Sequence, residues 1–167
     1  GRPGAGFSRG ATVLGGLASS RLDNSLVREQ QLAVRVVARA SIFAQAGQFV
    51  VYADAKPGVD KETLAAALDA EIAKFVAEGP TADEIQRATT VYAAGQIRGL
   101  EQVGGFGGKA PTLAEGLLYQ GDPAAYKTTL TRAAALTPEQ VRDVTAKWIS
   151  RPTFELIVEP GERTEGG

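Results

Sequence analysis

The spacing of apolar and polar residues predicts two strands in the first third of the chain. In residues 32–40, Val34, Val36 and Ala38 share one face of an extended segment, and residues 48–55 alternate in the same way. Alternation with a period of two, rich in β-branched residues, is typical of strands. The connection between the two segments is short enough for an antiparallel hairpin.

Beyond the hairpin, the apolar residues recur with the period of a helix. Asp60 is the predicted N-cap of the first long helix, and Gly79 is its predicted end. Thr81 and Glu84 have the spacing of a capping box, in which each side chain binds a backbone N–H group of the other residue. A second long helix should therefore begin there and reach about Leu100.

Three shorter helices are predicted after the glycine-rich residues 104–108. The first covers residues 110–119, and the second starts with Pro123 at its first helical position, where the missing N–H group costs nothing. The third opens with a capping box in residues 137–140. Its buried face should consist of Val141, Val144 and Trp148.

Near the start of the chain, small apolar residues predict a helix over residues 11–17. The pair Gly15 and Gly16 would allow that helix to end in a left-handed conformation. Ser20 is the predicted cap of a short helix that continues through Arg28.

The end of the chain alternates again, and residues 153–158 are therefore a predicted last strand. Helices grouped between antiparallel strands indicate an α+β fold, with an antiparallel sheet covered by several helices. No repeat or linker divides the chain, so we predict a single domain over residues 1–167, with flexible ends at residues 1–10 and 160–167.

Size and charge exclude several functional classes. The chain has 167 residues, of which 44% are hydrophobic and 22% are charged, as expected for one domain with one core. Its 18 basic and 19 acidic residues give a net charge of -1. Nucleic-acid and membrane-surface binders normally carry a basic excess. The charge balance therefore predicts no nucleic-acid partner. No apolar run approaches the length of a membrane span, so we expect no membrane insertion.

The chain has no histidine and no cysteine. The usual zinc ligand sets, Ser-His-Asp and Cys-His catalytic groups and disulfides therefore cannot be built from it. We predict no catalytic residue and no metal ligand in this chain. Carboxylate, lysine or tyrosine chemistry remains, but no two acidic residues stand out as a facing pair.

Arginine supplies the candidate binding residues. Arg35 and Arg39 share a strand face, where anion binding and a surface salt bridge are equally good explanations. Arg28 lies between the short helix and the first strand, next to Glu29, and a guanidinium at such a corner can bind a backbone carbonyl or a carboxylate. A structural salt bridge is the local alternative. The glycine-rich loop at residues 105–110 follows a helix, so it is interpreted as a helix break and not as a nucleotide site.

Several short motifs in order resemble the insulinase/pitrilysin family of zinc metallopeptidases, which includes the mitochondrial processing peptidases. The segments that carry the resemblance are VLGG at 13–16, SSRL at 19–22, LVRE at 26–29, GQF at 47–49, EGPT-x-x-E at 78–84, LTPEQV at 136–141 and Pro160. Together they cover most of the chain, from about Ala11 to Pro160.

The resemblance implies a division of labour between two half-domains. In that family one half holds zinc on an H-x-x-E-H helix, and the other closes over the substrate with an arginine and a tyrosine. This chain resembles the second, C-terminal half, with Arg28 at the position of the arginine and Val34 at that of the tyrosine. The family's first strand and part of its first helix would precede Ala11.

The resemblance therefore implies a non-catalytic domain that helps to bind an extended peptide. Its partner would be a zinc-bearing half-domain or subunit, so zinc is expected in that half and no cofactor in this chain. Exported bacterial relatives imply a periplasmic location. The alternatives are a scaffold domain without any peptidase and a carboxylate-based hydrolase. An H-x-x-E-H segment in the same gene or its neighbour would favour the peptidase.

Overall fold

The computed structural model describes residues 4–43 and 45–161. Two short π-helical segments, η1 and η2, stand beside the α-helices and the strands. In chain order the elements are α1 (Gly4–Ala11), η1 (Thr12–Gly16), η2 (Asp23–Glu29), β1 (Ala33–Ile42), β2 (Gly47–Ala55), α2 (Lys61–Glu78), α3 (Ala82–Glu101), α4 (Lys109–Gln120), α5 (Ala125–Ala134) and α6 (Pro138–Ile149).

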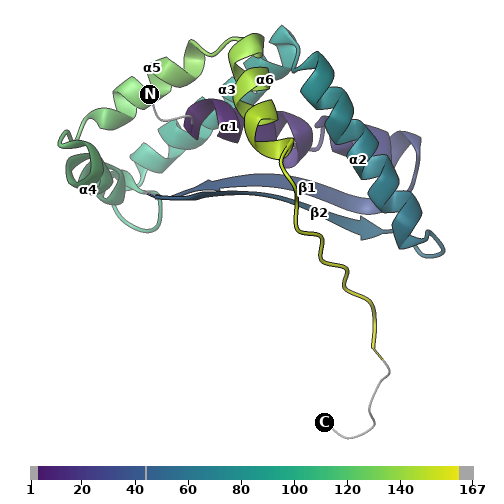
Figure 1. Cartoon of the computed structure of the whole chain (residues 1–167). Coiled ribbons are helices and arrows are strands. Elements are labelled where there is room, and N and C mark those ends of the chain that lie inside the picture. Colours follow the sequence, from purple (N-terminus) through teal and green to yellow (C-terminus); the bar gives the residue numbers. More distant parts are fainter. Residues whose placement is uncertain (1–3, 44, 162–167) are drawn as a thin grey trace, which may run out of the picture.

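The two predicted strands form the antiparallel hairpin that the alternation indicated. Val36 pairs with Ala53 and Ala38 with Val51, so their side chains lie on the face beneath the helices. Figure 1 shows the helices gathered on one side of the sheet, with none of the described helices on its other side. The α+β architecture predicted from the sequence is confirmed.

The core lies between this sheet face and the helices. Its fully buried large side chains come from elements that are far apart in the sequence, and each contributes about 1.5–3 kcal/mol of burial free energy. They are Leu14, Leu22, Leu26, Phe75 and Val141. Leu22 and Leu26 come from the short SSRL and LVRE motifs, so these motifs are part of the hydrophobic core.

The first helical segment begins earlier than predicted and ends for a different reason. α1 starts at Gly4, so residues 4–10 are helical although the sequence predicts a flexible segment there. Gly15 has φ -156°, so the predicted left-handed termination is wrong. A Cβ on Gly15 would lie 2.5 Å from the backbone nitrogen of Ala38. Glycine is needed here because the helix approaches β1 closely.

Ser20 closes the turn between η1 and η2. The prediction that it caps the next helix is wrong. Its hydroxyl accepts a hydrogen bond from the backbone N–H of Leu17 at 2.8 Å and donates one to the carbonyl of Thr12 at 2.8 Å. η2 has Leu22 at its N-cap position, without a side-chain hydrogen bond. Because the chain folds back at this point, the Ser20 hydroxyl binds backbone groups of η1 and of the turn after it, and not those of η2.

Arg21 joins the segment between η1 and η2 to the two long helices, α2 and α3. Its guanidinium forms a bidentate pair with Glu84 of α3, with Nε 2.7 Å from Oε1 and Nη2 2.8 Å from Oε2. Nη2 also donates to the carbonyl of Gly79 at the end of α2, at 2.8 Å. The guanidinium carbon lies 5.3 Å from the centre of the Phe75 ring. We call this group of four residues the Arg21 clamp.

Glu84 serves the clamp and the capping box of α3 at once. Its carboxylate accepts the backbone N–H of Thr81 at 2.7 Å while it pairs with Arg21. Burial opposes ionisation of Glu84 most strongly, but the hydrogen bonds from Arg21 and Thr81 outweigh it, so the pKa of Glu84 is lowered. The hydrogen bond to Glu84 is the main reason why the pKa of Arg21 is raised.

The last two α-helices, α5 and α6, differ in detail from their predictions. α5 begins at Ala125, and Pro123 lies in the preceding turn, so its predicted helical position is wrong. The Asp122 carboxylate shapes that turn by accepting the N–H of Ala124 at 2.8 Å. In α6, Trp148 is 40% exposed and is not part of the buried face.

Trp148 is exposed because a different residue of α6 faces inward. Thr145 lies one turn after Val141, and both are fully buried. The Trp148 ring instead faces the guanidinium of Arg151, whose carbon is 4.4 Å from the ring centre. Cations can cover an exposed indole in this way. The capping box predicted for this helix, with Thr137 and Gln140, is confirmed.

The predicted last strand is not present in the structure. Residues 153–158 pair with neither β1 nor β2, and Phe154 and Val158 are 89% and 85% exposed. Figure 1 shows this segment leaving α6 and running away from the body. The alternation allows a strand, but a strand forms only where the segment pairs with another strand, and this segment pairs with neither edge of the hairpin.

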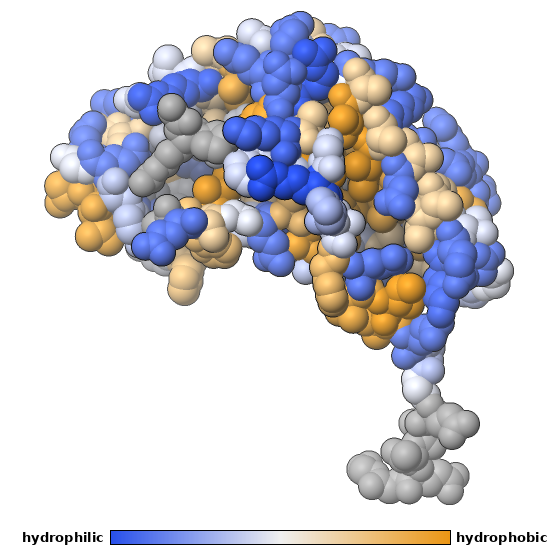
Figure 2. All heavy atoms as spheres, viewed as in Figure 1, coloured by the Kyte–Doolittle hydropathy of each residue, from blue (hydrophilic) through white to orange (hydrophobic). Residues whose placement is uncertain are grey.

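Exposed apolar side chains are found on α4 as well as in residues 153–158. Figure 2 shows apolar atoms at the end of the molecule where α4 lies, and Leu117, Leu118 and Tyr119 of that helix are exposed.

Within residues 4–43 and 45–161, no helix is long and apolar enough to cross a membrane.

We expect Glu84→Gln to lower the free energy of unfolding by about 2 kcal/mol at neutral pH, between the values for exposed and buried ion pairs. Because the folded state lowers the pKa of Glu84, the ionised carboxylate stabilises the fold above the ordinary glutamate pKa of 4.5 and loses this effect as the pH falls further. Urea unfolding at several pH values should show the difference from wild type shrinking in acid. Asp54→Asn, which breaks an exposed pair, is the control and should change stability little. An equal effect of both variants would contradict the clamp.

We expect Gly15→Ala to destabilise the protein by about 1–3 kcal/mol, because the added methyl group meets β1. Gly95→Ala in α3 is the matched control. Its Cβ would meet nothing within 4 Å, so the variant should gain about 0.5–1 kcal/mol from the lower helical cost of alanine. Thermal unfolding of both variants measures the contrast. A Gly15→Ala variant as stable as wild type would contradict the close approach of Gly15 to β1.

Candidate functional site

Arg28 lies at the end of η2, where the chain enters the sheet. Its Nε donates to Oδ2 of Asp23 at 2.9 Å, and its Nη2 donates to the carbonyl of Ala18 at 2.8 Å. The side chain is still 61% exposed. The guanidinium is thus held in one orientation by a carboxylate and a carbonyl while part of it faces solvent.

The passage from η2 into β1 is sharply turned. Gln31 has φ 55°, an uncommon conformation for a residue other than glycine. Backbone hydrogen bonds fix the turn, from the N–H of Gln30 to the carbonyl of Ser25 and from that of Leu32 to Leu26. The direction in which β1 leaves Arg28 is therefore set by the backbone.

Val34 lies on a β-bulge at the start of β1. Ala33 pairs with Ala55 and Arg35 pairs with Asp54, so Val34 has no partner of its own on β2. Its side chain is 58% exposed, and the prediction that it shares the buried face of Val36 and Ala38 is wrong. The extra residue reverses the side-chain alternation at this point. The position where the resemblance calls for a tyrosine therefore faces outward.

The face of the sheet away from the helices carries the two strand arginines. Nε of Arg35 lies 3.1 Å from Oδ2 of Asp54, directly across the hairpin, and both side chains are more than half exposed. Arg39 is exposed on the same strand. For Arg35 the structure supports a surface salt bridge. Tyr52, which is 56% exposed, adds a phenol to this strand pair.

Acidic residues gather at one shallow pocket of about 220 Å³ between η2 and α2. Glu29, Glu71 and Glu78 line it together with Arg21 and Lys74. The Glu71 carboxylate accepts a hydrogen bond from the Ser25 hydroxyl at 2.7 Å. A general acid typically lies in an apolar surrounding, whereas these carboxylates share the pocket with Arg21 and Lys74. The pocket therefore does not favour a carboxylate-based hydrolase.

The donor atoms of this chain do not fit a zinc site. Zinc in proteins is held mainly by imidazole and thiolate groups, and the sequence has neither. In the part of the chain that the structure describes, no group of three acidic residues, those of the shallow pocket included, is placed so that it could hold a metal ion.

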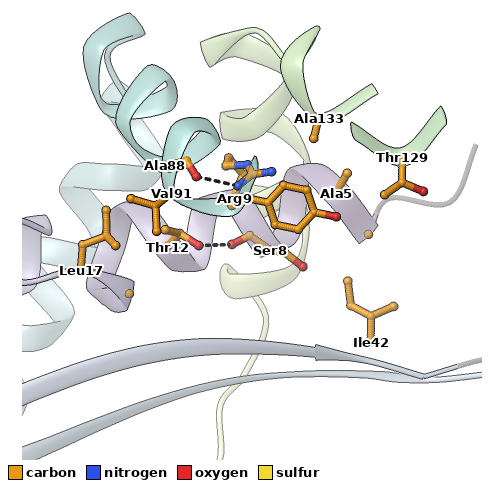
Figure 3. Close-up of a pocket in the computed structure, with 13 residues that line it drawn as sticks. Ala5, Ser8, Arg9, Thr12, Leu17, Ile42, Ala88, Val91, Thr129 and Ala133 are labelled. Atoms are coloured by element: carbon orange, nitrogen blue, oxygen red, sulfur yellow. Dashed lines mark hydrogen bonds between the residues drawn. The ribbon is translucent and has the colours of Figure 1, made fainter. Parts of the chain in front are cut away.

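Arg9, which no sequence motif singled out, lines a larger cavity of about 400 Å³. The residue is only 4% exposed, and its Nη1 donates to the carbonyl of Ala88 at 2.9 Å (Figure 3). The helical spacing of Phe7, Ala11 and Leu14 could have indicated that α1 packs on the core. Phe7 lies within residues 1–10, which are predicted to be flexible, so this spacing extends across the predicted boundary at residue 10.

The motifs that suggested a peptidase half-domain agree with comparisons to known proteins. Residues 6–92, slightly more than half of the chain, match the family model described as the peptidase M16 inactive domain. The chain is 32% identical over 147 residues to an uncharacterized zinc protease of Streptomyces coelicolor. The alignment covers 87% of this chain and 31% of that protein, so the chain spans about a third of its relative.

Solved structures share the fold. A peptidase M16 inactive domain from Pseudomonas fluorescens superposes with a TM-score of 0.73 at 20% identity, over 88% of this chain and 34% of the other. The periplasmic protease PqqL from Escherichia coli superposes with a TM-score of 0.61 at 19% identity, over 89% of this chain and 15% of the other. In both, this fold is one part of a longer chain. The match to the family model, with the ordered motifs and the α+β fold, places this chain in the family of the peptidase M16 inactive domain.

Proposed function

We propose that this chain is the non-catalytic C-terminal domain of a zinc metallopeptidase, which closes over the zinc-bearing half and helps to hold an extended peptide. Membership of the peptidase M16 inactive-domain family supports the non-catalytic role. The observation that carries the peptide-binding role is the position of Arg28. Its guanidinium is anchored by Asp23 and is still 61% exposed, next to the first residues of a strand.

The sheet provides a backbone on which an extended peptide can bind. Among the described residues it has only two strands, so β1 and β2 each have one edge without a strand neighbour. A peptide added to such an edge gains main-chain hydrogen bonds, and a nearby guanidinium can bind a carbonyl or carboxylate of that peptide. Closure of a second domain over the peptide would exclude water from the reaction.

In this proposal the zinc ion belongs to the other half of the peptidase. Zinc there would polarise the scissile carbonyl or activate water. This chain would contribute binding and positioning only. We also propose a periplasmic location, which is supported by the structural likeness to the periplasmic protease PqqL.

One observation favours a second candidate, a scaffold domain that keeps the fold without peptidase activity. Val34 occupies the exposed position on the bulge where the family resemblance calls for a tyrosine. Valine cannot donate a phenolic hydrogen bond to a peptide. In the scaffold role, Arg28 would serve only its local pair with Asp23.

The Arg28→Ala variant separates these two functions in the complete peptidase, with this chain joined to its zinc-bearing half. We expect KM for a peptide substrate to rise about tenfold with little change in kcat. A guanidinium that binds the substrate as strongly as it binds the transition state contributes to KM and not to kcat. Urea unfolding should show a loss of less than about 1 kcal/mol, as for an exposed pair.

Arg35→Ala is the matched control, since Arg35 is also an exposed arginine paired with an aspartate. Its KM should equal that of wild type. An unchanged KM in Arg28→Ala would refute the peptide-binding role. A zinc-loaded complete protein that cleaves no peptide in a broad library would support the scaffold.

The isolated chain should bind no stoichiometric zinc and hydrolyse no peptide, because it lacks imidazole and thiolate ligands. Elemental analysis after dialysis against zinc, together with a fluorogenic peptide assay, measures both properties. Zinc retained at one ion per chain, or cleavage that persists after removal of contaminating proteases, would overturn the non-catalytic assignment.

A further inference from the structure

The larger cavity lies between helices that are far apart in sequence. Figure 3 shows Ala5, Ser8 and Arg9 along α1 and Thr12 at the start of η1, with Ala88 and Val91 from α3, Thr129 and Ala133 from α5, and Ile42 at the end of β1. Its volume of about 400 Å³ is within the range of pockets that hold small molecules. The cavity is distinct from the corner at Arg28, since none of its lining residues belongs to η2 or to the start of β1.

Arg9 is the one charged residue among the described residues that line this cavity. Its guanidinium carbon lies 4.5 Å from the centre of the Tyr92 ring, and Nη1 donates to Ala88. Nε is buried without a hydrogen-bond partner in the described structure. Burial lowers the pKa of Arg9, and the Tyr92 phenol partly opposes that effect.

The other buried or corner arginines have carboxylate partners. Arg21 pairs with Glu84 and Arg28 with Asp23, whereas none of the ion pairs within the described residues includes Arg9. A buried charge is strongly disfavoured unless an opposite charge and hydrogen bonds compensate for it. An anion within the cavity would supply both.

We propose that the cavity binds a small carboxylate with an apolar body, with the carboxylate on Arg9 and the apolar part against Ile42, Val91 and Ala133. One guanidinium matches the single charge and the two oxygens of a carboxylate. A phosphate dianion would leave charge uncompensated among these walls. The side chains around the guanidinium are mainly aliphatic or small, and they provide a favourable surface for a hydrocarbon chain.

Hexanoate is a suitable probe, with hexan-1-ol as the uncharged analogue of the same length. Isothermal titration calorimetry on the full chain should give one site for hexanoate and binding at least tenfold weaker for hexan-1-ol. Arg9→Met should weaken hexanoate binding at least tenfold, as expected for the loss of a charged hydrogen bond. It should also raise Tm without ligand, because methionine buries no charge.

Two further variants keep the test decisive. Arg35→Met removes an exposed arginine outside the cavity and should bind hexanoate as wild type does. Val91→Phe leaves Arg9 in place and narrows the cavity at a residue that is 47% exposed, so it should weaken binding even if Arg9→Met does not fold. Equal affinity for hexanoate and hexan-1-ol, no hexanoate binding at all, or full binding by Val91→Phe would overturn the proposal.

Discussion

The bidentate pair between Arg21 and Glu84 is the interaction on which the arrangement of the helices depends. Arg21 follows the turn between η1 and η2, yet it contacts the end of α2 and the start of α3. Glu84 closes the capping box of α3 with the same carboxylate. The angle between the long helices and the position of η2 are therefore determined together, and the last residues of η2 include Arg28.

Close backbone approach is the second constraint. Gly15 brings the first helix onto β1 without a Cβ, which places Leu14 in the core and holds the sheet against the helices. The bulge at Val34 then reverses the alternation at the start of β1. Val34 at the start of that strand is consequently exposed, and Arg28 at the end of η2 is exposed as well, whereas Val36 and Ala38 farther along β1 are buried under the helices.

Arg21, Arg28 and Arg9 illustrate how the surroundings of a side chain decide the role of one residue type. Arg21 is enclosed and fully paired, so it stabilises the fold. Arg28 is paired but mostly exposed, which suits contact with a peptide. Arg9 is enclosed without a carboxylate among the described residues, which makes it the arginine best suited to a ligand of opposite charge. Their sequence contexts do not distinguish these roles.

Local signals in the sequence were sufficient for the hairpin, for both capping boxes and for the α+β class, because each depends on residues close together in the chain. The missing histidine and cysteine likewise determined that this chain cannot assemble a conventional zinc site. The partner of Arg21, the burial of Arg9 and the outward position of Val34 were decided only by tertiary structure, since each depends on a segment distant in the sequence or on a shift in strand register. The alternation of residues 153–158 makes the same point, because an alternating segment becomes a strand only where the tertiary structure pairs it with another strand, and here it is paired with neither β1 nor β2.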